Sequence, residues 1–444
     1  MPSSHTTAPS CHWFSALAAV LDPRSDARLA VLFLGAVLAR GRRTVTSWIR
    51  AAGLGHDFRP CYTTVAAAGK RADLVAARLA HAVVKPLVAG DDRLTFALDD
   101  TPTERYGPHV QGAGVHHNPT PGPAHRPFVY GHIWVVLGLL VAHPAWGVIA
   151  LPLLARLYVR RKDLGSIDPW HRPAFKTKLE LATELVRWAV TWLGFWGKPV
   201  WAVVDGAYAK APFLKPTIRL GVTVVSRLRK DAALRGVPGP RRTGRRGRPR
   251  IYGEHRIDLA KRAGQRRGWA SGTFELYGKP TAKRYKTFLA TWRPAGGPIR
   301  VVLVDEPRGW VAYFCTDPSA TAADVLTAVA ERFSLEGTFK DCKEVVGAGQ
   351  QQVRFVWASV GAFHVCLWAF TMTEAWAWNR AEGELVGHRA ASPWDDEPRR
   401  PSHADKRRAW RRELLAEEIH AVLRPGMTER EMMAAAERLL NVAA

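Results

Sequence analysis

The stretch FALDDTPTERYG, residues 96–107, carries an apolar run straight into two adjacent aspartates and then into a turn. With the residues before it, this run predicts a buried strand over residues 93–100. A carboxylate is costly to remove from water unless a cation or hydrogen-bond donors compensate it. Asp99 and Asp100 at the mouth of a buried strand therefore indicate a bound cation, and further carboxylates should reach it from elsewhere in the chain.

The next segments predict the rest of a sheet. Residues 132–159, HIWVVLGLLVAHPAWGVIALPLLARLYV, are apolar enough for a membrane span, but Pro144 and Gly147 indicate a turn in the middle. We therefore expect a buried β-hairpin. An amphipathic helix is expected over residues 169–194, followed by the strand VWAVV, which runs directly into Asp205. With the strand GVTVVSRLR after it, this order predicts a mixed α/β sheet.

The second half of the chain begins with a strongly basic segment. Residues 227–268 hold 15 lysines and arginines against 3 carboxylates, and their Gly- and Arg-rich centre predicts a flexible loop. Four short strand patterns follow up to residue 317 and predict a β-rich insertion. Residues 319–347 predict one long helix that contains Glu336, and residues 356–378 predict a second, apolar helix.

The first 90 residues and the charged last 60 residues are expected to be helical. Near the N-terminus, helices flanking a turn at Thr46–Trp48 could form a helix-turn-helix, and an ordinary helical bundle fits the pattern equally well.

Charge and cysteine content narrow the class of protein. The 444 residues include 64 lysines and arginines against 39 acidic residues, a net charge of +25. This excess predicts a polyanionic partner, most simply nucleic acid; the alternative is a basic protein without such a partner. Five cysteines without C-x-x-C spacing argue against a zinc ribbon or a disulfide framework. No signal-peptide pattern is evident, and we expect a cytoplasmic protein.

The carboxylates at the predicted strand ends can be collected with one from the late helix. Asp100, Asp205 and Glu336 on neighbouring elements could hold two divalent cations through hard oxygen ligands, as Mg²⁺ requires. Two such ions activate an attacking oxygen and stabilise a leaving oxygen in phosphoryl transfer. Taken singly, each residue has an ordinary explanation, since strand-end aspartates commonly cap turns and helical glutamates are usually solvated.

At these residues the sequence resembles the D-D-E transposases of bacterial insertion sequences, in particular those with a β-strand insertion in an RNase H-like core. That subgroup carries the signature Y-x-x-R-x-x-x-E-x-x-x-x-x-x-K, and Arg332, Glu336 and Lys343 match its last three positions. Val329 stands at the tyrosine position. The first family aspartate is followed by threonine, as Asp100 is here, so we choose Asp100 over Asp99 as the metal ligand. We expect Asp99 to lie behind the ligands without binding the ion itself.

The resemblance implies a fold, a reaction and partners. It implies an RNase H-like mixed sheet interrupted by a β-rich insertion, with Asp100, Asp205 and Glu336 as catalytic residues and as ligands of two Mg²⁺ or Mn²⁺ ions. The substrates would be double-stranded DNA, namely the terminal inverted repeats of a transposon and its target, cleaved and joined by a homodimer. The alternatives are a metal-dependent nuclease on the same fold without strand transfer, and a non-catalytic DNA-binding derivative.

The expected organisation has five parts: a helical region at 1–90, the first part of the core at 91–226, the basic loop and insertion at 227–318, the core helices at 319–380 and a charged helical region at 381–444.

The remaining candidates are contacts to DNA. Arg332 and Lys343 are expected near the scissile phosphate, Arg227 and Arg229 in the basic segment, and Trp292 against an extruded base.

A Gly/Pro-rich loop with four histidines is open to two interpretations. Its histidines are His116, His117, His125 and His132. Without regular ligand spacing, DNA contact or a structural role is favoured over a zinc site.

Overall fold

The computed structural model describes residues 9–54, 58–118, 126–239, 248–387, 389, 399–422, 426–434 and 436. The centre of the predicted basic loop, residues 240–247, and His125 lie outside the described residues.

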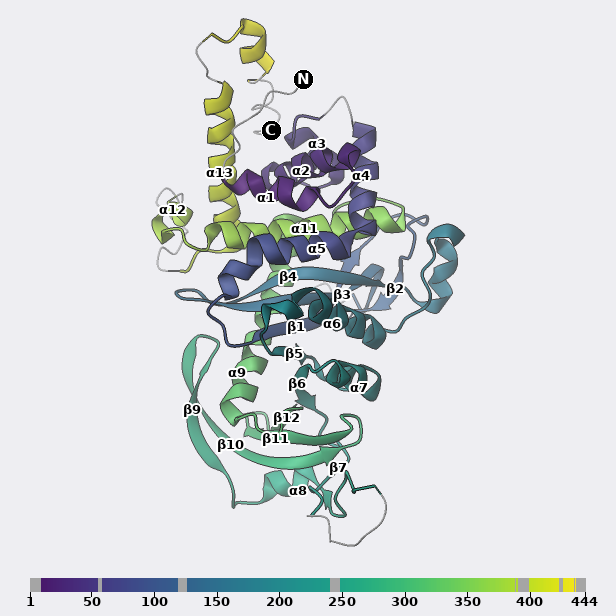
Figure 1. Cartoon of the computed structure of the whole chain (residues 1–444), viewed down its shortest axis with the longest axis vertical. Coiled ribbons are helices and arrows are strands. Elements are labelled where there is room, and N and C mark those ends of the chain that lie inside the picture. The colour runs from purple at the N-terminus through teal and green to yellow at the C-terminus, as the bar shows by residue number, and fades with distance from the viewer. Residues whose placement is uncertain are drawn as a thin grey trace.

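Five strands form the core of the sheet. β1 (Leu94–Glu104) pairs antiparallel with β3 (Phe128–His143), which pairs with β4 (Gly147–Tyr158). On its other side β1 pairs parallel with β5 (Val200–Val204), and β5 pairs parallel with β6 (Thr223–Leu228). The spatial order β4-β3-β1-β5-β6 is that of an RNase H-like core, as predicted (Figure 1). The apolar segment 132–159 is the β3–β4 hairpin.

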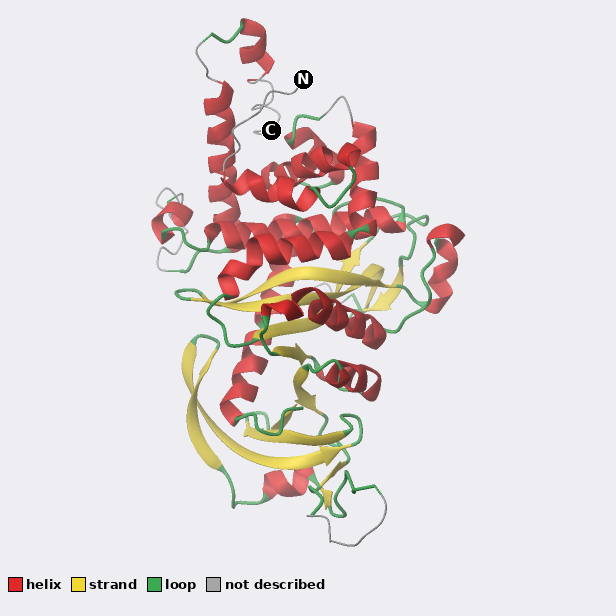
Figure 2. Cartoon of the chain, in the orientation of Figure 1, coloured by secondary structure: helices red, strands yellow, loops and turns green. Residues whose placement is uncertain are grey.

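The insertion extends the same sheet. Its order continues from β6 to β12 (Val311–Cys315), β11 (Gly297–Asp305), β10 (Lys279–Trp292), β7 (Leu234–Arg235) and β8 (Arg256–Ile257). β9 (Ala270–Leu276) pairs with β10, and β2 (Gly114–His117) pairs with β3. The short helix α8 (Leu259–Gly264) lies beside β10 and β7 (Figure 2). The five-stranded core and the insertion therefore share one continuous strand array.

Alternation along β5 defines two faces of the sheet. Ala202 and Val204 join the core packed under α6 (Lys178–Leu193) and α7 (Ala211–Arg219), which we call the α6 face. Trp201 and Val203 pack instead against α9 (Ala322–Arg332), which we call the α9 face. Because successive strand residues point to opposite faces, the register assigns every neighbouring residue to one of them.

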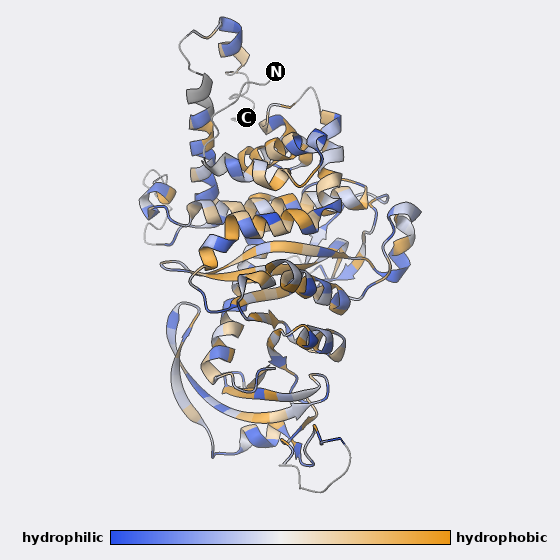
Figure 3. Ribbon diagram, viewed as in Figure 1, coloured by the Kyte–Doolittle hydropathy of each residue, from blue (hydrophilic) through white to orange (hydrophobic). Residues whose placement is uncertain are grey.

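Helices from both ends of the chain cover β4. The N-terminal helices are α1 (Pro9–Ala18), α2 (Pro23–Leu38), α3 (Val45–Ala51), α4 (Phe58–Lys70) and α5 (Ala72–Leu79), followed by short turns up to Val88. α11 (Val356–Ala377) packs between α4 and β4, so apolar residues concentrate in this layer (Figure 3). By length and composition α11 could cross a membrane, but 94% of its most apolar window is buried inside the protein.

Two local predictions were wrong. Thr46–Trp48 is no turn: these residues lie inside α3, whose capping box begins at Thr44 and whose Trp48 is fully buried. The single long helix over 319–347 is divided into α9, α10 (Ser334–Asp341) and a π-helical turn, η7 (Cys342–Val346). The break at Phe333 places Glu336 in the first turn of a new helix.

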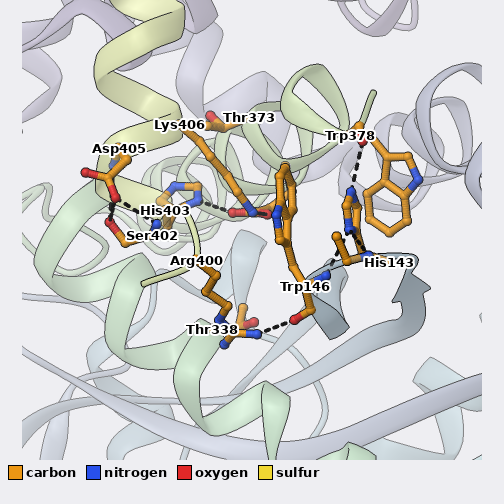
Figure 4. A network of polar contacts seen from close by, with 12 residues as sticks. His143, Trp146, Thr338, Thr373, Trp378, Arg400, Ser402, His403, Asp405 and Lys406 are labelled. Carbon is orange, nitrogen blue, oxygen red and sulfur yellow. Dashed lines mark hydrogen bonds and ion pairs between the residues drawn. The ribbon is translucent and has the colours of Figure 1, made fainter. Parts of the chain in front are cut away.

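The C-terminal part adds α12 (Glu382–Val386) and α13 (His403–Val422). A buried polar network fastens α13 to α11 and to the β3–β4 turn (Figure 4).

Candidate active site

The two aspartates of β1 point to opposite faces of the sheet. Asp100 shares the α6 face, where its Oδ2 lies 2.5 Å from Nζ of Lys178 and its Oδ1 accepts a hydrogen bond of 3.1 Å from the Tyr208 hydroxyl. Asp99 faces α9, where its Oδ2 lies 2.7 Å from Nη1 of Arg332. The backbone N–H of Asp100 donates to Oδ1 of Asp99 at 2.8 Å.

Asp205 belongs to the same face as Asp99. Leu98 of β1 is in register with Val204 of β5, so the next residues on the two strands lie side by side. Asp205 keeps an extended conformation and therefore continues the alternation of β5, which turns its side chain to the α9 face. It is exposed and accepts a hydrogen bond of 3.2 Å from the Ala207 N–H, the turn-capping role that such aspartates commonly have.

Glu336 reaches this group through Arg332. The Arg332 guanidinium lies 2.7 Å from Asp99 and 3.3 Å from Oε1 of Glu336, one helical turn further on. The structure thus joins Asp99, Arg332 and Glu336 in one chain of ion pairs. The sequence choice of Asp100, rather than Asp99, as the partner of Asp205 and Glu336 stays a prediction. In this structure the Asp100 side chain is engaged on the opposite face.

The charge of Asp99 is incompletely compensated. The pKa of Asp99 is raised to about 6, chiefly by burial and also by the charges of Asp100 and Asp205, while Arg332 and the Asp100 N–H oppose the rise. A cation at this point would restore the ionised form. Among the described residues, no three His, Cys, Asp or Glu side chains are close enough to hold a metal ion. The oxygen-only donor set suits Mg²⁺ or Mn²⁺, provided that Glu336 and Asp205 close on Asp99.

The predicted basic contacts differ in their surroundings. Arg227 of β6 lies next to the turn after Asp205, since a Cβ built on Gly206 would come within 3.7 Å of the Arg227 Cβ. It is exposed, and in the described part of the chain no carboxylate pairs with it. Arg229 instead forms an exposed ion pair of 2.7 Å with Asp231. Arg227 is thus the better placed of the two for a phosphate near the carboxylates.

Lys343 lines a separate hollow. This cavity of about 1030 Å³ lies beyond the end of β1, between Arg42, Glu104, Lys343 and Gln352. Burial lowers the pKa of Lys343. No side chain of the α9-face carboxylate group contacts Lys343 in the described residues, so its predicted role at the scissile phosphate stays a prediction.

Trp292 is not available to a base. It is 8% exposed and packs edge-to-face against Phe314, with ring centroids 5.1 Å apart. The prediction missed two exposed rings beside the site: Tyr277, at the tip of the β9–β10 hairpin, meets Phe333 with centroids 6.0 Å apart. The sequence signal for this tip was the dipeptide Tyr277-Gly278, which occupies a two-residue hairpin loop.

Two of the described histidines of the Gly/Pro-rich loop, His116 and His132, are withdrawn from solvent, whereas His117 is exposed. His132 is fully buried between the Arg105 guanidinium, 3.0 Å away, and the Gln111 carbonyl oxygen, 2.9 Å away. Burial lowers the pKa of His116 to about 4 and that of His132 to about 3. The two rings therefore add no charge to this loop at neutral pH.

Comparison with protein families identifies the family to which the chain belongs. A family model described as a DDE superfamily endonuclease matches residues 17–293, more than half of the chain. The chain belongs to this family. The matched segment includes Asp99, Asp100 and Asp205 and ends before Glu336, so the third carboxylate rests on the ion-pair geometry and on the signature around it. A comparison with curated proteins finds no match to the chain.

Proposed function

We propose that this DDE endonuclease is the transposase of an insertion sequence, which cleaves DNA at transposon ends and joins the freed ends to target DNA. The carrying observation is the convergence of Asp99, Arg332 and Glu336, with Asp205 beside them, on the face of the sheet where the exposed Arg227 also lies. The excess of basic residues suits a DNA substrate.

Asp99, Asp205 and Glu336 would hold two Mg²⁺ or Mn²⁺ ions. Such ions activate an attacking oxygen and stabilise the leaving oxygen of an in-line displacement. The protein keeps Asp99 oriented through the Asp100 N–H and through Arg332. With its two carboxylate partners engaged as ligands, the Arg332 guanidinium would be free to hold a phosphate of the DNA.

Asp100 has a different role in this proposal. Held by Lys178 and Tyr208, it ties β1 to α6 and to the turn after Asp205, and so acts on the carboxylates indirectly. Its place before Thr101, which the family pattern gives to the metal ligand, remains the competing assignment.

The experiment compares Asp99→Asn with Asp100→Asn on a donor DNA that carries the inverted repeats of the element, in Mg²⁺. We expect Asp99→Asn to abolish cleavage and Asp100→Asn to retain measurable cleavage. The opposite result would assign the metal to Asp100. Strand transfer is followed separately, with a pre-cleaved end that carries a free 3′-hydroxyl. Cleavage without any joined product would favour the nuclease alternative, and DNA binding without cleavage would favour the non-catalytic one.

A further inference from the structure

Three arginines surround a hollow in the insertion, far along the sheet from the carboxylates. Arg235 of β7, Arg256 of β8 and Arg293 at the end of β10 line a cavity of about 320 Å³ together with Tyr252 and Thr291. We call this cavity the arginine pocket. Arg256 and Arg293 are exposed, whereas Thr291 forms a buried wall.

The strand register forces two of these charges together. Arg235 stands directly opposite Arg256 in the β7–β8 pair, and like charges in that position destabilise a sheet. In the described residues, no carboxylate pairs with Arg235, Arg256 or Arg293. Arg235 reaches only the carbonyl oxygens of Gly253 and Glu254, both at 3.4 Å, and the Glu254 carboxylate is taken by Arg250. Within the part of the chain that the structure describes, the group therefore lacks a counter-charge.

The arginine pocket opens on the α9 face. Tyr285 of β10 packs with the core on that face, and alternation carries the same direction to Thr291. Thr291 is in register with Arg235, and Arg235 with Arg256. The intervening Leu234 and Trp292 are buried on the opposite side, in the core of the α6 face. The carboxylate group and the three arginines thus lie on the same face of the twisted sheet.

We infer that the arginine pocket binds a backbone phosphate of duplex DNA whose cleaved bond lies at the carboxylates. Five strand-to-strand steps separate β5, at whose end Asp205 lies, from β7, and at about 4.8 Å for each step they span roughly 24 Å along the sheet. At about 3.4 Å per base pair, this corresponds to roughly seven base pairs along the duplex. The inference rests on the proposed function for the identity of the DNA, but the binding itself requires no catalysis.

The experiment measures binding of a 30-base-pair transposon end by fluorescence anisotropy in EDTA, at several salt concentrations. The full-length Arg235→Gln/Arg256→Gln/Arg293→Gln variant is compared with Arg187→Gln/Lys215→Gln/Arg219→Gln. The control variant removes three exposed charges from α6 and α7, on the opposite face. We expect the pocket variant to bind roughly tenfold or more weakly, with the salt slope smaller by about one to three. Equal losses in the two variants would overturn the inference.

Two further measurements locate the phosphate and guard against misfolding. Neutral methylphosphonate linkages are placed one at a time along the duplex. Replacement roughly seven base pairs from the cleaved bond should weaken binding by the natural protein and leave the pocket variant unaffected. A uniform response along the duplex would contradict the inference.

Arg256→Gln alone should raise the melting temperature, because it relieves the repulsion with Arg235. A lower melting temperature would give Arg256 a structural role and overturn the inference. If the protein binds in this manner but never cleaves, the proposed function fails and the pocket stands.

Discussion

Two groups of charged side chains differ in how far the protein buries and compensates a carboxylate. In the buried network between α11 and α13, Glu374 lies 2.6 Å from Nζ of Lys406 and 2.7 Å from Nδ1 of His403. All three side chains are at most 4% exposed. At the α9 face, Asp99 and Glu336 share one guanidinium, and the Glu336 side chain is 44% exposed.

The pKa shifts run in opposite directions for a physical reason. Burial alone would raise the pKa of Glu374, but Lys406 and His403 outweigh it and lower the pKa to about 2. At Asp99 burial outweighs Arg332, and the pKa rises to about 6. The charge of Glu374 is compensated within the protein and fixes α13 in place, so we call Glu374, Lys406 and His403 the complete group. The charge of Asp99 is only partly compensated, which is the condition in which a cation binds. We call Asp99, Asp205 and Glu336 the incomplete group.

The largest effect is expected at the incomplete group. Glu336→Gln or Asp205→Asn should lower the rate of DNA cleavage by at least about 10⁴-fold, roughly 5 kcal/mol of transition-state stabilisation, because either change removes a metal ligand. The rate is measured on a labelled transposon end under single-turnover conditions.

DNA binding and thermal stability serve as controls for these two variants. Glu336 and Asp205 are exposed, so both variants should melt close to the natural protein and retain their affinity for DNA. A variant that cleaves normally would show that its carboxylate is no part of the reaction.

The next effect is expected in the complete group. Lys406→Met should lower the free energy of unfolding by about 3–5 kcal/mol, because it leaves the Glu374 carboxylate buried without its main partner. The double variant Glu374→Leu/Lys406→Met should recover most of that loss, since it removes both charges. Lys162→Met, an exposed site, serves as the matched control and should change stability by less than about 0.5 kcal/mol in urea titrations. Equal losses in the single and double variants would mean that packing, and not charge pairing, holds α13.

The same comparison explains what the sequence could predict. The strand order and the hairpin at residues 132–159 follow from apolar runs interrupted by turn residues, which are local signals. Which of Asp99 and Asp100 faces Glu336 depends on register and on the placement of α9, so the dipeptide alone did not settle it. Trp292 looked available only because burial by Phe314 is a contact between distant strands. Arg235 and Arg256 likewise meet only through strand pairing.

Acid should weaken the complete group through protonation of Glu374. The folded pKa of Glu374 is about 2, below its ordinary value of 4.5. Its stabilisation is therefore fully present above about pH 4.5 and is lost as the pH falls toward 2, a loss of roughly 3 kcal/mol. Unfolding free energies measured between pH 5 and 2.5 should fall less steeply in Glu374→Gln than in the natural protein. Identical slopes would remove Glu374 from the acid response.

The smallest effect concerns strain beside the incomplete group. Tyr277 has a φ of 56° and is followed by Gly278 with a φ of 71°, so both residues of the hairpin loop are left-handed. Asn-Gly is the preferred pair for such a loop, whereas tyrosine is strained there by about 1 kcal/mol. The Tyr277 ring makes only an exposed contact with Phe333, which stabilises the fold by roughly 0.5 kcal/mol.

Tyr277→Asn should therefore stabilise the protein by about 0.5 kcal/mol, measured as a rise in melting temperature by calorimetry. Phe333→Leu removes the ring contact but keeps the strain, and should lower stability by a similar amount. If Tyr277→Asn instead costs more than about 1 kcal/mol, the ring contact outweighs the strain of the loop. The β9–β10 tip would then be held against α10 as firmly as α13 is held against α11, and the contrast between the two regions would be limited to their carboxylates.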